Sequence, residues 1–402
     1  MKKAISLYLH VHQPYRIRHY TVFDTGANHD YFDAPYDSNY SNERILKKVV
    51  EKSYLPTNKR LLELLEANDN FKLSLSLTGT VLEQLEMWSP EALDSFKKLV
   101  DTGRVEILGE TFHHTLAFFY SRNEFETQVQ MHKEKIESLF GQTPNVFRNT
   151  ELAYNNDLAK WADQKGYKGI LAEGWDPILE WRSPNYIYRP AGTDNICLLL
   201  KNYKLSDDIA FRFGDSDWAE YPLTADKFSH WLSEDTDAQV FNLFMDYETF
   251  GEHQWHESGI FSFLEHLPKE WLKNQEHSFM SVSEAIDSFE SVGEIDVPKT
   301  VTWADTERDL SAWVGNSMQA NAIYSIYQLE EKLMSAHDLA LIEDWRRLQT
   351  SDHFYYMCTK YFNDGDIHAY FSPYETPYEA YLNFMNSYRD IVYRLAAKGI
   401  MV

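Results

Sequence analysis

The chain has 402 residues and a formal net charge of −24, and 44% of its residues are hydrophobic and 15% aromatic. This composition excludes a disordered chain, and the negative charge disfavours nucleic acid and anionic membrane surfaces as partners, because both are polyanions. We therefore expect a globular protein with a neutral or cationic partner, and its 11 Trp and 26 Tyr residues suit sugar rings as well as a bulky core.

The N-terminal segment does not have the pattern of a signal peptide. Its short apolar run is interrupted by His10, His12 and Pro14, where a secretory signal would continue. Two cysteines, Cys197 and Cys358, are too few for a disulfide framework. No window has the roughly 18 consecutive apolar residues that a membrane span requires. We expect a cytoplasmic protein.

Seven short apolar segments rich in β-forming residues predict strands. They are residues 4–11, 71–77, 104–109, 145–150, 168–173, 196–202 and 239–246. Helical periodicity lies between several of them, at 58–69, 92–103 and 157–166. The last two segments end at a glycine, the residue that commonly closes a helix. This alternation of strands and helices predicts parallel strands, because each crossover must return the chain across the sheet.

Polar and acidic residues gather where these strands end. The set comprises His10, His12, Thr78, Glu110, His113, His114, Glu151, Glu173, Asn202, Asp246 and Glu248. In a barrel of parallel strands the loops at the carboxyl ends converge on one mouth, where the chemistry lies. The pattern therefore favours a closed barrel over an open, doubly wound sheet.

Two other regions depart from the strand and helix alternation. Residues 20–42 are aromatic and acidic without a period, which predicts a long loop over the mouth or a packed insertion. The alternation stops near 291–300, and residues 318–338 and 377–399 are strongly helical. We predict a catalytic barrel over residues 1–295 and a C-terminal helical subdomain over 296–402 that contributes to the substrate cleft. We find no internal repeat and no glycine-rich phosphate loop.

Glu151 and Asp246 are the best candidates for a catalytic pair. Each directly follows a predicted buried strand, and cleavage of a glycosidic bond requires two carboxyl groups, one as nucleophile or base and one as acid. Arg148 precedes Glu151 by three residues. Its positive charge would keep Glu151 ionised or would serve a structural salt bridge.

Two further pairs have more than one interpretation. His10 and His12 lie on the same face of a strand, where they would bind sugar hydroxyls or hold a divalent metal with Asp246 or Glu110. Asp309 and Trp313 are four residues apart and can share a helical face, which suits a sugar subsite. They equally suit the start of a helix capped by Thr306.

The sequence resembles glycoside hydrolase family 57, especially its shorter α-amylase-type members. Five segments carry the resemblance, in the family's order: "HVHQP" (10–14), "GRVEILGETFHHTLA" (103–117), "FRNTELAYNN" (147–156), "FMDYETFGEHQ" (244–254) and "TERDLSAWVGN" (306–316). The resemblance implies a (β/α)7 barrel, an incomplete relative of the eight-fold barrel, followed by a helical domain.

By this resemblance Glu151 is the nucleophile and Asp246 the general acid/base of a retaining enzyme that acts on α-glucans or maltooligosaccharides. The residues expected to bind substrate are His10, His12, Gln13, His114, Arg148, Glu248, His253, Asp309 and Trp313, and neither a metal nor another cofactor is expected. The family's glucanotransferases and branching enzymes tend to have a glutamate near the position of His114 and a tryptophan near that of His253. The two histidines here therefore favour amylase-type activity.

Two other functions remain open from the sequence. A metal-dependent polysaccharide deacetylase would hold zinc at His10 and His12. A glucan-binding protein would keep the pocket without turnover.

Overall fold

The computed structural model describes residues 2–360 and 372–402, which form two compact units. The barrel unit contains Met1–His12, Lys47–Glu110 and His132–Trp303, and the helical unit contains Gln13–Leu46, Thr111–Met131 and Ala304–Val402. These units differ from the predicted division at residue 295, because two segments from the first third of the chain pack with the C-terminal helices.

All seven predicted strands are present, and their pairings with one another are parallel. They are β1 (Lys3–Val11), β2 (Leu73–Leu77), β3 (Val105–Ile107), β4 (Val146–Phe147), β5 (Gly169–Glu173), β7 (Cys197–Lys201) and β8 (Val240–Asp246). Strand β1 pairs with β2 on one side and β8 on the other, and β2 pairs with β3. In the second sheet β5 lies between β4 and β7.

Main-chain hydrogen bonds join the two sheets into a ring. Between β3 and β4, Gly109 N donates to Val146 O at 2.9 Å and Arg148 N donates to Gly109 O at 2.8 Å. Between β7 and β8, Asn202 N donates to Asn242 O at 2.9 Å. The strands therefore close in the order β1, β2, β3, β4, β5, β7, β8, which confirms the (β/α)7 barrel.

Three short strands were not predicted. They are β6 (Ile187–Pro190), which is antiparallel to β7, β9 (His277–Phe279), which pairs with the start of β1, and β10 (Glu294–Ile295), which pairs with β6. Each is two to four residues long and lies outside the ring of seven strands.

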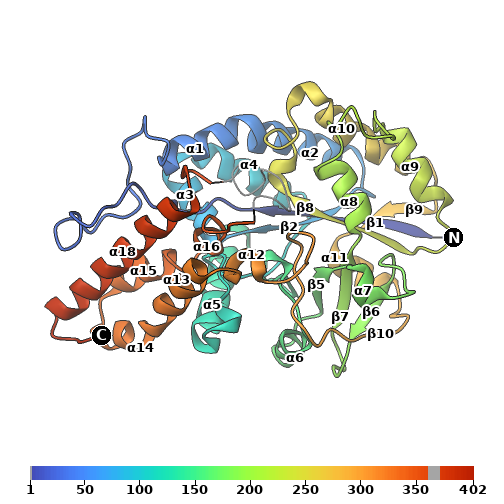
Figure 1. Cartoon of the computed structure of the whole chain (residues 1–402). Helices are drawn as coiled ribbons and strands as arrows, with labels where there is room; N and C mark the ends of the chain where they lie inside the picture. Colours follow the sequence, from blue (N-terminus) through green and yellow to red (C-terminus); the bar gives the residue numbers. More distant parts are fainter. Residues whose placement is uncertain (1, 361–371) are drawn as a thin grey trace. The chain divides into compact units, whose positions relative to one another are not determined.

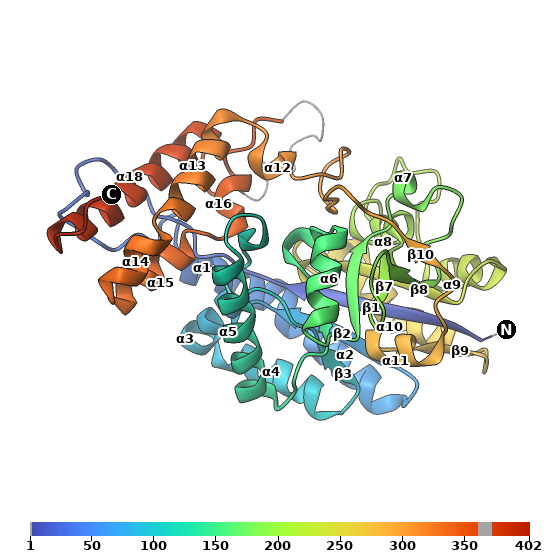
Figure 2. The ribbon, with the colours of Figure 1, turned by 90° about the horizontal axis from the view of Figure 1, so that it is seen from below.

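Helices surround the strands of the barrel unit, as Figures 1 and 2 show. They are α2 (Leu55–Ala67), α3 (Gly79–Trp88), α4 (Pro90–Asp101), α6 (Asn156–Gln164), α7 (Asp176–Leu179), α8 (Tyr203–Ala210), α9 (Ala225–Glu234), α10 (Ile260–Trp271) and α11 (Val282–Ser288), with the π-helical turn η1 (Val50–Tyr54) before α2. Gly103 and Gly166 follow α4 and α6 with φ angles of 70° and 81°. The left-handed backbone predicted at these helix ends is therefore confirmed.

The first half of the chain contains two further helices, α1 (Asn42–Val49) and α5 (Arg122–Phe140). Short 3-10 turns occur along the chain as η2 (Ala117–Phe119), η3 (Thr150–Leu152), η4 (Tyr247–Thr249) and η5 (His256–Ser258).

The core of the barrel is made by apolar side chains from different strands. Tyr8 of β1 and Phe244 of β8 pack edge to face, with ring centroids 5.6 Å apart. Leu171 of β5 and Leu199 of β7 belong to the same buried cluster. This packed interior leaves the strand ends as the place for polar groups.

The helical unit contains α12 (Ser311–Val314), α13 (Ser317–Gln328), α14 (Glu330–Ala336), α15 (Leu339–Arg347), α16 (Ser351–Tyr355) and α18 (Pro377–Ala397). The two predicted helical regions are present, and the first is divided at Leu329 between α13 and α14. Trp345 is fully buried and its indole donates to Ile326 O at 2.7 Å, which ties α15 to α13.

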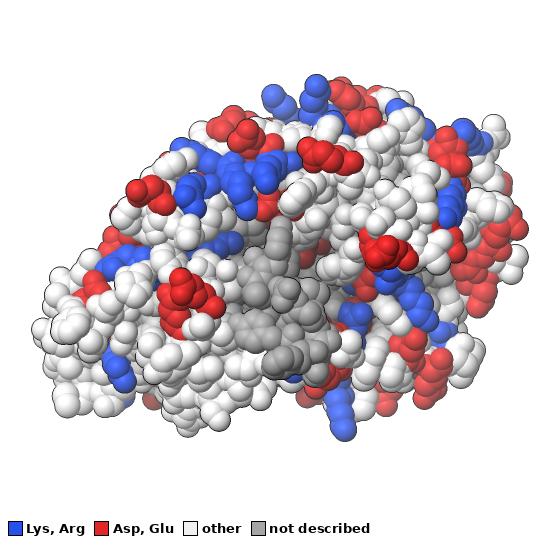
Figure 3. Space-filling model, turned by 45° about the horizontal axis from the view of Figure 1, so that its top comes forward, with Lys and Arg blue, Asp and Glu red and all other residues white. Residues whose placement is uncertain are grey.

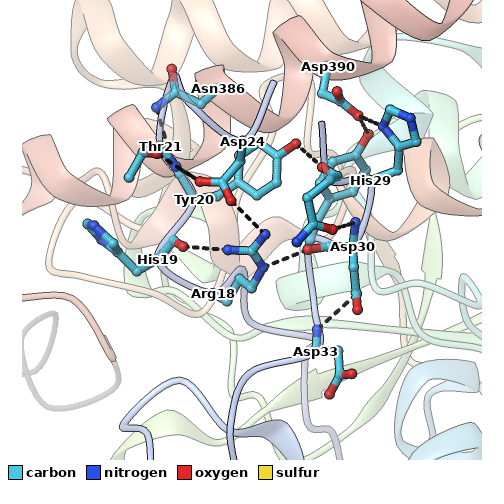
Figure 4. Close-up of polar contacts among 12 residues, drawn as sticks. Arg18, His19, Tyr20, Thr21, Asp24, His29, Asp30, Asp33, Asn386 and Asp390 are labelled. Carbon is cyan, nitrogen blue, oxygen red and sulfur yellow. Dashed lines mark hydrogen bonds and ion pairs between the residues drawn. The ribbon is translucent and has the colours of Figure 1, made fainter. Parts of the chain in front are cut away.

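The aromatic and acidic segment 20–42 is a packed insertion of the helical unit. Its N-terminal part lies against α18, where Asn386 Nδ2 donates to Tyr20 O at 3.0 Å (Figure 4). Asp390 is fully buried and accepts hydrogen bonds from Gly26 N at 2.6 Å and from the Tyr31 hydroxyl at 2.5 Å, and His29 Nδ1 lies 2.8 Å from the same carboxylate. The insertion is thus tied to α18 by Asn386 and by the buried carboxylate of Asp390.

Among the described residues, none of the helices has the length and hydropathy needed to cross a membrane. Acidic and basic side chains are both scattered across the face in Figure 3.

Candidate active site at the carboxyl ends of the barrel strands

His10 lies near the end of β1, which is flanked by β2 and β8. It is in register with Ser76 of β2 and with Asp246 of β8. Neighbouring strands are about 4.8 Å apart, and side chains in register point to the same face of the sheet. The Nδ1 atom of His10 is 2.9 Å from the Ser76 hydroxyl. The structure thus brings His10 and Asp246 together, two residues separated by most of the barrel sequence.

His12 continues the same face of β1. Its Nδ1 atom is 2.9 Å from the Thr78 hydroxyl, and its ring stacks on that of His10 with centroids 5.9 Å apart. The two histidines therefore face the same way, as predicted from their spacing, and each has a hydroxyl from the β2 side that fixes its ring.

Tyr8 is a member of this constellation that the sequence interpretation missed. Its hydroxyl is 2.6 Å from the Ser76 hydroxyl. Burial raises the pKa of Tyr8 above its ordinary value, and among the charges near it that of Arg148 opposes the shift whereas those of Glu110 and Asp246 add to it. The tyrosine is therefore within electrostatic reach of charges at the ends of β3, β4 and β8, and its place two residues before His10 could have revealed it.

Glu110 is a fully buried carboxylate just beyond β3. One of its oxygens is 3.6 Å from His10 Nδ1 and the other is 3.8 Å from Arg148 Nη1. A buried charge is costly unless it is paired, so this glutamate needs Arg148 beside it. Arg148 thus forms a buried ion pair with Glu110, which fits the second of its two predicted roles, that of a structural salt bridge. Its effect on the ionisation of Glu151 stays a prediction.

His132 of α5 binds the main chain of Glu110 and is another residue that the sequence did not indicate. The Glu110 main-chain N–H donates to His132 Nδ1 at 3.4 Å, and Nε2 is 2.9 Å from Leu77 O, so the ring accepts at one nitrogen and donates at the other. The pKa of His132 is lowered, and burial is the largest cause. The neutral imidazole therefore links the ends of β2 and β3.

Glu151 lies in the turn η3 after β4 and has an unusual backbone. Its φ and ψ are 58° and 25°, in the left-handed region that residues other than glycine rarely adopt. The turn is held by Leu152 N donating to Asn149 O at 3.0 Å and Ala153 N donating to Thr150 O at 2.9 Å. Strained backbone of this kind is concentrated at functional sites, which favours Glu151 as a reacting residue.

Trp303 holds Glu151 at two points, and no pattern in the sequence had singled it out. Its indole Nε1–H donates to Glu151 Oε2 at 2.8 Å, and its main-chain N–H donates to Glu151 O at 3.2 Å. The preceding chain is fixed by a bridge in which Tyr154 and Val301 exchange hydrogen bonds of 2.9 Å. The segment that leads to Trp303 is therefore held against the chain that follows Glu151.

Two cations lie over the indole of Trp303. The Arg148 guanidinium carbon is 4.9 Å from the ring centroid and the Lys201 ammonium is 5.4 Å from it. Lys201 is in turn 3.8 Å from Glu173 and 3.2 Å from Asp207. The ends of β4, β5 and β7 thus meet around one aromatic ring.

The loop after β8 contributes Glu248 and His253. Glu248 is 5% exposed and accepts a hydrogen bond from the Tyr54 hydroxyl of η1. Burial lowers the pKa of His253 to about 4; Glu252 opposes this shift, whereas the positive charge of Lys48 adds to it. His253 is therefore a neutral imidazole at ordinary pH, able to donate at one nitrogen and accept at the other.

The other predicted substrate-binding residues belong to the helical unit. Gln13 is buried and accepts from Arg16 Nη2 at 3.1 Å. His114 has a left-handed backbone with a φ of 53°, and its carbonyl accepts from Ser351 N at 2.9 Å. Its neighbour His113 is fully buried, with Nε2 3.7 Å from Glu343.

The prediction that Asp309 and Trp313 share a helical face is wrong, because α12 begins only at Ser311. Asp309 instead accepts from the Ser311 main-chain N–H at 2.8 Å. Trp313 is 1% exposed and its ring packs on Tyr355, with centroids 5.8 Å apart. In the helical unit Trp313 is thus a core residue, and a substrate role for these two residues stays a prediction.

Comparison with known proteins identifies the family. The model of glycosyl hydrolase family 57 matches residues 6–298. A protein of Methanocaldococcus jannaschii, provisionally named an α-amylase, is 42% identical over 401 residues, which cover 97% of this chain and 84% of the relative. An α-amylase of Pyrococcus horikoshii is 24% identical over 52% of this chain and 32% of its own length.

Solved structures share the fold at low identity. A branching enzyme of Thermococcus kodakaraensis has a TM-score of 0.73 at 14% identity, covering 98% of this chain and 90% of that one. The amylase AmyC of Thermotoga maritima has a TM-score of 0.63 at 15% identity, covering 100% of this chain and 95% of that one. The chain is therefore a glycoside hydrolase and belongs to glycosyl hydrolase family 57.

Proposed function

We propose that this protein is a retaining α-glucan hydrolase of amylase type that cleaves α-1,4 bonds between glucose units. The observation that carries the proposal is the pair of strand-end carboxyl groups. Glu151 has a strained backbone and is held by Trp303, and Asp246 is in register with His10. The M. jannaschii relative, named for amylase activity and matching nearly the whole chain, supports the choice of substrate.

The reaction proceeds in two displacements. Glu151 attacks the anomeric carbon while Asp246 transfers its proton to the glycosidic oxygen, which leaves as a free hydroxyl and gives a β-linked glycosyl-enzyme. Asp246, now a carboxylate, removes a proton from water, and the water oxygen displaces Glu151. The product has the α configuration, because the anomeric carbon has been inverted twice.

The surrounding residues serve this cycle in distinct ways. His10 and His12 have rings fixed by Ser76 and Thr78, so they are oriented to form hydrogen bonds with sugar hydroxyls. Glu248 and His253 follow Asp246 on the same loop and are proposed to bind the sugar beside the proton donor. For a retaining enzyme we expect the Glu151 and Asp246 carboxyl groups to be about 5–5.5 Å apart.

Product analysis tests the proposal directly. The protein is incubated with maltooligosaccharides and glycogen, the products are separated by chromatography, and the anomer formed first is read by proton NMR. We expect shorter maltooligosaccharides with initial α configuration. Absence of product from every α-glucan, or initial β configuration, would contradict the proposed reaction.

Variants of the carboxyl pair provide the internal control. Glu151→Gln and Asp246→Asn should each reduce turnover by at least about 10²–10⁴-fold. Glu294→Gln and Asp287→Asn are matched changes of acids paired at the surface with Arg189 and Lys168, and they should leave turnover intact. Sugar binding that persists in the inactive variants, together with turnover in the wild type, excludes a protein that only binds glucan.

The same experiment separates hydrolysis from transfer. His114 and His253 occupy positions where the family's transferases tend to differ, so we expect products shorter than the substrate. Formation of longer oligosaccharides from a pure maltooligosaccharide would instead indicate a transferase. Zinc analysis of the same preparation tests the deacetylase alternative, which requires stoichiometric metal at His10 and His12.

A further inference from the structure

We propose that Trp303 is the positioning residue of the nucleophile, holding Glu151 in its attacking orientation and in its ionised form. This inference rests on the proposed function, because it takes Glu151 as the nucleophile. It deepens that function by assigning a role to a residue 152 positions away in the sequence.

The first step of the argument is the two-point contact. The main-chain N–H of Trp303 donates to Glu151 O at 3.2 Å and its indole N–H donates to Glu151 Oε2 at 2.8 Å. A left-handed backbone at a glutamate persists only where neighbouring groups determine it. One residue that binds both the carbonyl and the carboxylate fixes the backbone and the side chain together.

The second step concerns charge. Arg148 and Lys201 lie 4.9 Å and 5.4 Å from the indole centroid, and both side chains are almost fully buried. Cations over an aromatic face draw on its electron density, which makes the indole N–H a stronger donor. A stronger donor favours the carboxylate form of Glu151 over the protonated form.

The third step explains why an indole suits this place better than a cation. An indole has a single N–H, so it orients one oxygen of the Glu151 carboxylate, whereas a guanidinium or ammonium group has several donors. Arg148 and Lys201 lie over the ring face, and each is 3.8 Å from another acid, Glu110 and Glu173 respectively.

The test uses Trp303→Phe, which keeps an aromatic ring under the cations and removes only the indole N–H. We expect kcat/KM on maltooligosaccharides to fall by about 10- to 100-fold, the effect of losing a hydrogen bond to a charged group. The fall should lie in kcat more than in KM. The acidic limb of the kcat/KM profile should move to higher pH, because the carboxylate form of Glu151 has lost a donor.

A matched control is available in the same unit. Trp271 is fully buried, whereas Trp303 is partly buried, and the Trp271 indole donates to the neutral carbonyl of Ser278 at 2.9 Å. Trp271→Phe should lower the melting temperature at least as much and leave the pH profile unchanged. Trp303→His keeps a ring N–H and should recover part of the lost activity and part of the shift, and it provides a second variant if Trp303→Phe fails to fold.

The outcomes are distinguishable. A folded Trp303→Phe variant whose acidic limb matches that of the wild type overturns the positioning role while the proposed function stands. An equal shift in Trp271→Phe overturns it as well, because the effect would then be a general loss of packing. If the wild-type protein cleaves no α-glucan, the proposed function is wrong, and the positioning role, which depends on it, is wrong as well.

Discussion

Asp246 of β8 lies in register with His10 of β1, whose Nδ1 atom is 2.9 Å from the Ser76 hydroxyl of β2. Three neighbouring strands thus end in an acid, an imidazole and a hydroxyl that face the same way. Asp246 is partly buried at the boundary between the apolar strand and the strand-end polar groups. This environment suits a carboxyl group that must hold a proton until the glycosidic oxygen accepts it.

Asp246→Asn should affect substrates according to their leaving group. We expect hydrolysis of maltooligosaccharides to fall by about 10²–10⁴-fold, because the departing sugar oxygen needs a proton. The first step with α-maltosyl fluoride should fall much less, since fluoride leaves without one. The measurement is pre-steady-state fluoride release, with Glu151→Gln as the comparison that should lose both reactions. Equal losses on both substrates in Asp246→Asn would contradict its role as proton donor.

His253 should make the folded state less stable in mild acid. Its pKa is lowered from 6.5 to about 4, so the unfolded chain binds a proton at this histidine between these values while the folded chain does not. Stability is therefore retained above pH 6.5 and lost as the pH falls from 6.5 towards about 4, by at most about 3 kcal/mol. Urea denaturation at a series of pH values measures this loss, and His253→Gln should show a shallower fall.

The comparison with His253→Gln needs a control, because fully buried histidines elsewhere in the chain act in the same direction. Burial also lowers the pKa of His113 and His132. Their contribution remains in the variant, so the difference between variant and wild type isolates His253. His256→Gln changes an exposed histidine three residues along the same loop and should retain the wild-type slope. If all three proteins lose stability in parallel, the assignment to His253 is wrong.

The barrel could be predicted because its strands have a local signature. The seven ring strands are apolar segments that end in polar residues, so both their existence and their polar ends are visible in short windows. The strands β6, β9 and β10 were not predicted, because these short segments become strands only through their pairing with β7, β1 and β6. The helical unit escaped in part because nothing local in residues 13–46 shows that Asn386 and Asp390 hold that segment.

The site shows the same division between local and non-local information. Glu151 and Asp246 stand directly after strands, and a reader of the sequence can place them. Trp303 is 152 residues from Glu151, and only folding shows that its indole meets the carboxylate. The prediction that Asp309 and Trp313 share a helical face failed because a four-residue spacing does not show where a helix begins, and α12 begins at Ser311.

Asp390→Asn should release the insertion of the helical unit without unfolding the protein. The carboxylate is fully buried and accepts hydrogen bonds from the Gly26 N–H and the Tyr31 hydroxyl. His29 lies beside it (Figure 4). An asparagine has the same size but no charge, and its amide NH2 group would face the N–H and O–H groups that donate to the carboxylate. We therefore expect a loss of about 1–3 kcal/mol in the free energy of unfolding.

Limited proteolysis should locate that loss. Cleavage within residues 18–33 should become faster in Asp390→Asn at protease concentrations that leave the wild type intact, because the opening is local. Asp33→Asn changes an exposed acid of the same insertion and should keep the wild-type pattern. If cleavage instead rises equally across the chain, Asp390 stabilises the whole fold and does not act as a local anchor.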